Sequence, residues 1–132
     1  MQKTKGIELV FLAVGAVIGA VLRYRIGCSD VVVAGLCVNV LIVNVIGSFV
    51  LGLFSVFSPA FNLDTKFALF VAAGFCGSFT SMSSFALDTS NLLDNNSVNL
   101  AVLNIISNVG LSLGALISSR AIGTVIIENL LH

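Results

Sequence analysis

Neutral hydrogen-bond donors repeat along the last apolar stretch of the sequence. Asn104, Asn108 and Ser112 stand four residues apart, so a helix would align them on one face. Asn44 and Ser48 have the same spacing in an earlier apolar stretch. Amide and hydroxyl donors without a carboxylate beside them can replace part of the water shell of a small anion, and a phenylalanine ring can turn its positive edge toward it. The pattern therefore predicts either a polar cavity for an anion or a set of hydrogen bonds between helices.

A second chemical signal is the segment from Gly74 to Phe85, which reads GFCGSFTSMSSF. It closes an apolar run, residues 67–79, that is shorter than the roughly 20 residues a helix needs to span a bilayer. To cross the membrane, the segment must include the hydroxyl-rich residues 80–84. Glycine tolerates unusual backbone angles and Ser/Thr side chains compete for backbone hydrogen bonds, so we expect a helix break between Gly77 and Ser81. Carbonyl oxygens freed by such a break suit a hard cation such as sodium.

The overall composition places these residues in a membrane. The chain has 132 residues, of which 58% are hydrophobic and 9% are charged, far from the balance of a soluble globular domain. We predict an all-α, multi-pass protein of the cell membrane, in which residues 1–132 form one domain of four transmembrane helices. The expected spans are residues about 7–24, 31–57, 65–91 and 97–120, and the third of them is the broken segment.

The first expected span combines small residues with a basic end. Gly15 and Gly19 are four residues apart and predict close packing against another helix. The span ends with Arg23 and Arg25, which are either interfacial anchors or a positive vestibule that concentrates anions at a pore mouth. We interpret the three cysteines as small core residues: Cys28, Cys37 and Cys76.

The charged residues argue against several classes of function. Six basic and six acidic residues give a net charge of zero without a cluster of either sign, so nothing indicates nucleic acid as a partner. No ionisable residue falls in the central portion of an expected span, which disfavours a proton-coupled transporter. No nucleophile and base stand in a catalytic arrangement, so we expect no enzyme. The first span is flanked by two basic residues on each side, so the positive-charge bias is weak and we expect insertion in both orientations. Since four short helices cannot easily enclose a pore, we expect a dimer in the lipid bilayer.

Three short motifs occur in order along the chain: GxxxGAxxRY from Gly15, VNxxGSFxxG from Val43 and GFCGSFTSMSSF from Gly74. Together they resemble the Fluc/CrcB family of fluoride channels over nearly the whole chain. The resemblance implies an antiparallel dual-topology dimer with two fluoride pores, each built from both subunits. Fluoride would leave passively, down its electrochemical gradient, and the cytoplasm would be protected from its toxicity.

The resemblance also implies roles for individual residues. Backbone carbonyls of Gly77 and Thr80 from both subunits would hold one structural sodium ion at the dimer centre, and Arg23 would lie near an aqueous vestibule. The fluoride pore would be lined by six side chains: Asn44, Met82, Phe85, Asn104, Asn108 and Ser112.

The sequence departs from the family pattern at four positions. These are Met82 for a pore phenylalanine, Asn104 for a tyrosine, Asn108 for a serine and Val40 for a threonine. A thioether is polarizable but lacks the positive edge of a ring, so each pore is expected to keep the Phe85 contact and lose the other. Three hypotheses follow: a homodimer with altered conduction, a subunit of an obligate heterodimer with a related chain, and a subunit with little channel activity. A rival from another class is a small dual-topology drug-efflux transporter. Such a transporter needs a carboxylate inside its first span, and the only candidate in this chain, Glu8, lies at the start of the expected helix.

Overall fold

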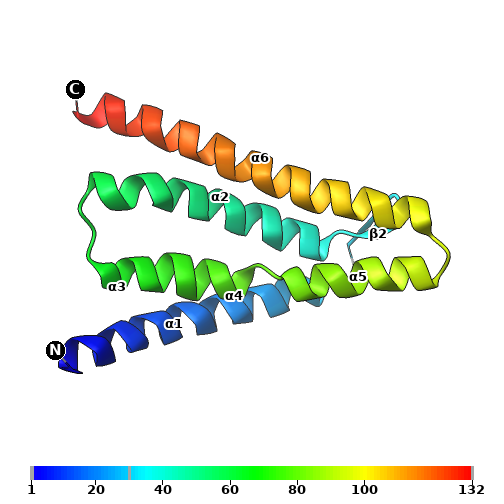
Figure 1. Cartoon of the computed structure of the whole chain (residues 1–132), viewed down its shortest axis with the longest axis horizontal. Coiled ribbons are helices and arrows are strands. Elements are labelled where there is room, and N and C mark those ends of the chain that lie inside the picture. The colour runs from blue at the N-terminus through cyan, green and yellow to red at the C-terminus, as the bar shows by residue number, and fades with distance from the viewer. Residues whose placement is uncertain (1, 30, 132) are drawn as a thin grey trace.

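Four long helical segments lie side by side along the molecule in the computed structural model, which describes residues 2–29 and 31–131 (Figure 1). They are α1 (Gln2–Gly27), α2 (Asn39–Ala60), a broken third segment (Thr65–Asp94) and α6 (Val98–Leu131). Each segment is long and apolar enough to cross a membrane. The prediction of an all-α membrane protein with four spans is therefore confirmed, and Figure 1 shows both chain termini at the same end of the bundle.

The third segment is assembled from four pieces. Its pieces are α3 (Thr65–Ala68), η1 (Leu69–Cys76), α4 (Gly77–Phe79) and α5 (Met82–Asp94). η1 is a stretch of π-helix, which no sequence signal predicted. Between α4 and α5, Thr80 and Ser81 adopt extended backbone angles. The expected break is thus present, close to the middle of the segment.

A small β-hairpin connects α1 to α2, where we had expected the second span to begin. β1 (Val32–Val33) pairs antiparallel with β2 (Leu36–Cys37) across Ala34 and Gly35. Both turn residues have positive φ, 52° and 85°, which is the backbone twist that two-residue hairpin loops require. The predicted start of the second span at residue 31 is therefore wrong, because this apolar stretch pairs as strands before the helix begins at Asn39.

The last helix is longer than predicted. We expected the span to end at residue 120, but α6 continues without interruption to Leu131. Its 34 residues correspond to about 51 Å at 1.5 Å per residue, against about 30 Å for a bilayer core. No proline follows Arg120 in the sequence, and apolar residues continue the helical pattern.

Glycines allow two close helix contacts that organise the bundle. Gly15 of α1 and Gly74 of η1 lie where these two helices meet, and a Cβ at Gly74 would lie 2.6 Å from the Leu12 carbonyl oxygen. Gly52 of α2 faces α6, where a Cβ would lie 2.5 Å from the Leu116 carbonyl oxygen. Real Cβ atoms do not come so close to backbone, so the prediction that Gly15 serves close packing is confirmed.

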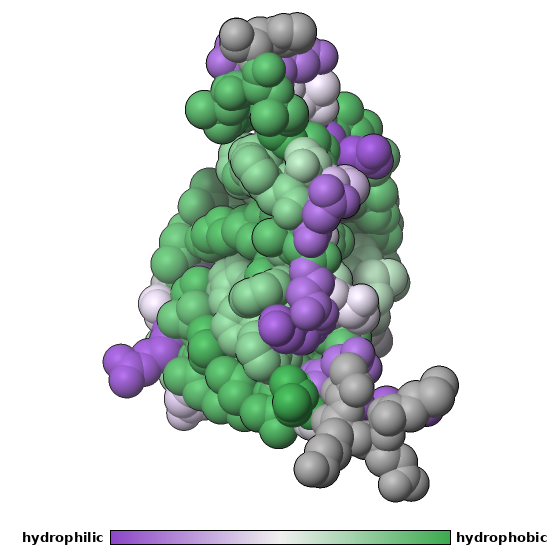
Figure 2. Space-filling model, turned by 90° about the vertical axis from the view of Figure 1, so that its left-hand side faces the viewer, coloured by the Kyte–Doolittle hydropathy of each residue, from purple (hydrophilic) through white to green (hydrophobic). Residues whose placement is uncertain are grey.

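Most of the outer surface is apolar. Figure 2 looks at the end that carries both termini: hydrophobic residues cover most of the flanks, and hydrophilic residues form a band across this end. Large apolar side chains such as Ile106 remain 63% exposed on the flanks, which suits contact with lipid or with another protein surface. The interpretation of the cysteines as core residues is wrong for Cys28 and Cys37, which are exposed near the α1–α2 connection. Only Cys76 is buried.

Candidate functional site

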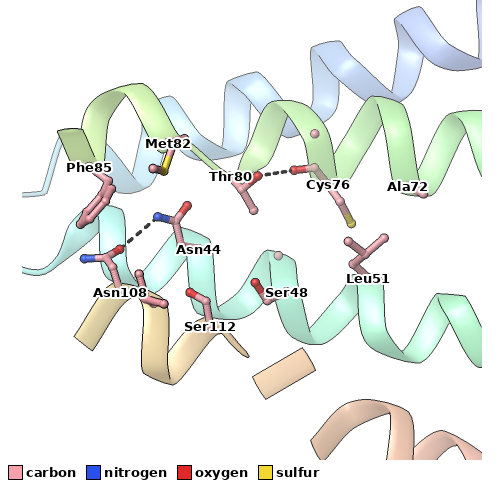
Figure 3. A pocket seen from close by; sticks show the side chains of 13 residues that line it. Asn44, Ser48, Leu51, Ala72, Cys76, Thr80, Met82, Phe85, Asn108 and Ser112 are labelled. Carbon is pink, nitrogen blue, oxygen red and sulfur yellow. Dashed lines mark hydrogen bonds between the residues drawn. The ribbon is translucent and has the colours of Figure 1, made fainter. Parts of the chain in front are cut away.

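A cavity of ≈ 350 Å³ lies beside the helix break, between α2, the third segment and α6 (Figure 3). None of its lining residues is ionised at neutral pH, because amides, hydroxyls, one thiol, one thioether and apolar groups make up the whole lining. Five predicted pore residues line it: Asn44, Met82, Phe85, Asn108 and Ser112. Both predicted cation ligands line it as well: Gly77 and Thr80.

A single peptide unit forms the break, the one that joins the Thr80 carbonyl to the Ser81 N–H. In a continuous helix the Ser81 N–H would donate to the Gly77 carbonyl. Here it donates to Asn44 Oδ1 at 2.8 Å, and the Thr80 carbonyl accepts a hydrogen bond from Arg23 Nη1 at 3.3 Å. Side chains from α1 and α2 thus bond to both backbone groups of this peptide unit, neither of which has a helical partner.

The hydroxyl groups that predicted the break also shape it. At the end of α4, Thr80 Oγ1 donates to the Cys76 carbonyl at 2.9 Å, which also accepts the Thr80 N–H at 3.0 Å (Figure 3). Ser81 Oγ accepts the Ser84 N–H at 3.1 Å and so caps the start of α5. We had assigned Ser81 no individual role, although a serine directly before a helical stretch is a signal for such a cap.

Asn104, Asn108 and Ser112 form the predicted polar stripe of α6, and hydrogen bonds connect the first two of them to each other and to neighbouring helices. Asn44 Nδ2 donates to Asn108 Oδ1 at 3.0 Å (Figure 3). Asn108 Nδ2 donates in turn to Asn104 Oδ1 at 2.9 Å, and Asn104 Nδ2 donates to Thr89 Oγ1 at 3.0 Å. Asn44 therefore bonds to neighbouring helices and also lines the cavity, while its role in a pore stays a prediction. Thr89 was missed, although its position four residues after Phe85 places both on one helix face.

Ser112 differs from the other members of the stripe. Its hydroxyl oxygen is buried and has no hydrogen-bond partner among the residues that the structure describes. Leaving a buried hydroxyl without a partner costs free energy, so an ion or water in the adjoining cavity would stabilise it. Among the lining residues, Ser112 gives the strongest indication that the cavity receives a polar occupant.

Two predicted site residues lie outside this cavity. Asn104 lines a second cavity of ≈ 260 Å³ together with Asp88, which lies about two helical turns beyond the break. Arg23 lines a third cavity of ≈ 280 Å³, which it shares with Asn39 and Ser84. The structure therefore divides the predicted residues among three neighbouring spaces.

Comparison with known proteins identifies the family of the chain. Residues 10–120 match the family described as CrcB-like protein, Camphor Resistance (CrcB). The chain belongs to this family. It is 58% identical over 125 residues to a protein of Nitrosopumilus maritimus named fluoride-specific ion channel FluC, and the alignment covers 95% of this chain and 99% of that relative. Proteins of the same name from Sulfurihydrogenibium sp. and Methanocaldococcus jannaschii are 44% and 41% identical and match 80% and 77% of this chain.

In this CrcB-family chain, the two residues predicted to face the pore from α5 have different environments. Phe85 is 8% exposed, whereas Met82 is 73% exposed although it lines the cavity. Figure 3 shows Met82 on the turn of α5 directly after the break, close to Asn44. A single chain therefore leaves the cavity uncovered beside Met82.

Proposed function

We propose that this chain forms a fluoride-selective channel, which exports fluoride passively and carries out no enzymatic reaction. The observation that carries the proposal is the uncharged cavity beside the break. Its lining includes the carboxamide of Asn44 and the buried hydroxyl of Ser112, which has no partner among the described residues. A lining without carboxylates does not repel a small anion, and neutral donors replace part of its water shell. The similarity to FluC proteins, one of them 58% identical, supports fluoride as the anion that passes through the channel.

The uncovered side of the cavity supports a dimer. Met82 is 73% exposed and Gly77 is also exposed, so lipid would reach the cavity of an isolated chain. Irregular backbone at membrane depth requires shielding by protein or by a water-filled space. We infer an antiparallel, dual-topology homodimer with two pores, in which the second copy covers this side. A heterodimer with a related chain is the alternative, and the thioether at position 82 is the feature that favours it.

The break also fits a structural sodium ion. The Gly77 carbonyl lacks the helical donation from the Ser81 N–H, and the Thr80 carbonyl lies in extended backbone. Among the described residues, Arg23 is the one donor to the Thr80 oxygen, so one of its two lone pairs is left for an ion. An added Cβ at Gly77 would meet only the Ala72 carbonyl oxygen, at 3.8 Å, so its own chain leaves the adjoining space open. A second copy would contribute the same two carbonyls, and bound sodium would supply a fixed positive charge next to the anion path.

Fluoride efflux from liposomes that contain only this protein tests the proposal. We expect rapid release of fluoride, no release of chloride, and slower release when N-methylglucamine replaces all sodium. A well-folded dimer without efflux would contradict the homodimeric channel. Co-expression with a related chain that has phenylalanine at both α5 positions would then separate a missing partner from a lost pore. Proton-coupled export of an organic cation would instead favour the drug-efflux transporter.

A further inference from the structure

Four side chains form a one-directional chain of hydrogen bonds, which we call the amide relay: Asn44, Asn108, Asn104 and Thr89. Each carboxamide accepts through its oxygen from one side and donates through its nitrogen to the next member. The three links measure 3.0, 2.9 and 3.0 Å. The relay runs from α2 through α6 to α5, and its members Asn104 and Asn108 are only 6% and 4% exposed.

Backbone groups at the two ends set the direction of the relay. At one end the Ser81 N–H, which can only donate, bonds to Asn44 Oδ1 at 2.8 Å. At the other end the Thr89 hydroxyl donates to the Phe85 carbonyl, which can only accept, at 2.8 Å. Turning any one carboxamide around would place two donors or two acceptors face to face. Both ends therefore demand the same orientation of all three carboxamides.

This orientation decides which member can offer a donor to the cavity. Asn108 Nδ2 donates twice, to the side-chain and the backbone oxygen of Asn104, so its N–H groups are both in use. Asn44 uses its oxygen on Ser81 and one N–H on Asn108, which leaves its second N–H without a partner among the described residues. Asn44 lines the cavity beside the break, whereas Asn104 lines a different one.

We propose that Asn108, Asn104 and Thr89 are positioning residues, which hold the Asn44 carboxamide so that its second N–H serves the anion. The sequence predicted Asn104 and Asn108 as separate contacts for the passing ion. In this proposal they instead act through Asn44. The inference rests on the proposed channel function, and it deepens that function by assigning the amide donor to one residue, Asn44.

Exchange of the Asn44 side-chain amide protons, followed by NMR, tests the relay without any transport. Asn108→Leu is expected to speed this exchange about tenfold or more, because it removes the acceptor of Asn44 Nδ2. Thr89→Val is expected to speed it about two- to tenfold, the range that corresponds to one hydrogen bond, and Thr89→Ser should restore the rate. Thr124→Val is the matched control, because the Thr124 hydroxyl makes the same type of bond, to the Arg120 carbonyl, outside the relay. Unchanged exchange at Asn44 in both relay variants would overturn the proposal.

Fluoride efflux then tests whether the relay acts through Asn44. We expect Asn108→Leu to lower efflux in the native chain but to change it less than about twofold in an Asn44→Ser background. An equal fold-loss in both backgrounds would mean that Asn108 contacts the ion independently, and the proposal would be wrong. Thr89 does not line the cavity, so in this proposal it affects efflux only through the relay. Unchanged efflux in Thr89→Val would therefore also contradict the proposal. If the unaltered protein conducts no fluoride, the channel function fails, while the exchange rates still decide whether the relay exists.

Discussion

Gly47 of α2 faces the helix break, and we predict that a methyl group at this position displaces Thr80. A Cβ at Gly47 would overlap Thr80 Cγ2, whereas the next atoms, Phe79 Cδ1 and Thr80 Cβ, lie 3.3 and 3.8 Å away. Rotation of Thr80 would break the bond from its hydroxyl to the Cys76 carbonyl, 2.9 Å long. Overpacking of this kind costs about 1–3 kcal/mol, and alanine gains about 0.5–1 kcal/mol over glycine inside a helix. Gly47→Ala is therefore expected to lower the free energy of unfolding by up to about 2.5 kcal/mol and to reduce fluoride efflux.

A second substitution makes this reasoning refutable. Thr80→Ser removes the overlapping Cγ2 and keeps the hydroxyl that bonds to Cys76, at a cost of about 0.8 kcal/mol for the lost methyl group. The double variant Gly47→Ala/Thr80→Ser is expected to be more stable than Gly47→Ala alone, and to recover efflux. Denaturant unfolding in detergent, followed by circular dichroism, measures both effects. If the two losses add in the double variant, Gly47 and Thr80 do not compete for the same space and the reasoning is wrong.

Substitutions at four further positions test other parts of the structure. Asn44→Ala removes a donor and an acceptor and should sharply reduce efflux, at a cost of about 1–3 kcal/mol for each buried group left unsatisfied; lower stability with unchanged efflux would leave Asn44 a packing role only. Arg23→Gln should slow efflux at low ionic strength, whereas Arg23→Lys should retain the rate if the charge forms a vestibule; equal rates for both would favour an interfacial anchor. Met82→Phe should change the rate or the fluoride/chloride selectivity, and no change in either would contradict a pore position. The pKa of Asp64 lies below its usual value because its carboxylate accepts the Lys66 backbone N–H and then pairs with the Lys66 ammonium at 3.3 Å. The contribution of Asp64 to stability is thus present above about pH 4 and is lost as the pH falls through the lowered pKa. Measurements of Tm against pH should show this loss, and Asp64→Asn should remove it.

The sequence predicted those features that depend on local chemistry. The third apolar run is too short for a span and is followed by hydroxyl groups, so the break near Ser81 could be located within a few residues. The four-residue spacing of Asn104 and Asn108 placed them side by side, and they are hydrogen-bonded. Gly15 was correctly predicted to lie at a helix contact, because the close approach of two helices requires the absence of a side chain at that position.

Features that depend on tertiary contacts could not be predicted in the same way. Four residues overshoot one helical turn by about 40°, so Asn104 and Ser112 differ in direction by about 80° and line different cavities. The partner of the Thr80 carbonyl, Arg23, lies 57 residues away in the sequence and only the packing of α1 reveals it. The valine-rich hairpin before Asn39 looked like the start of a span because apolar composition alone does not distinguish a short strand from a helix.

The peptide unit between Thr80 and Ser81 has consequences for how the protein is made. Both side chains that satisfy it, from Arg23 and Asn44, precede it in the chain. Synthesis proceeds from the N-terminus, so α1 and α2 leave the ribosome before the third segment does. The guanidinium and carboxamide groups are then already present when this peptide unit enters the bilayer. Moving the third segment to the start of the chain would remove this advantage, even though every contact of the finished fold could still form.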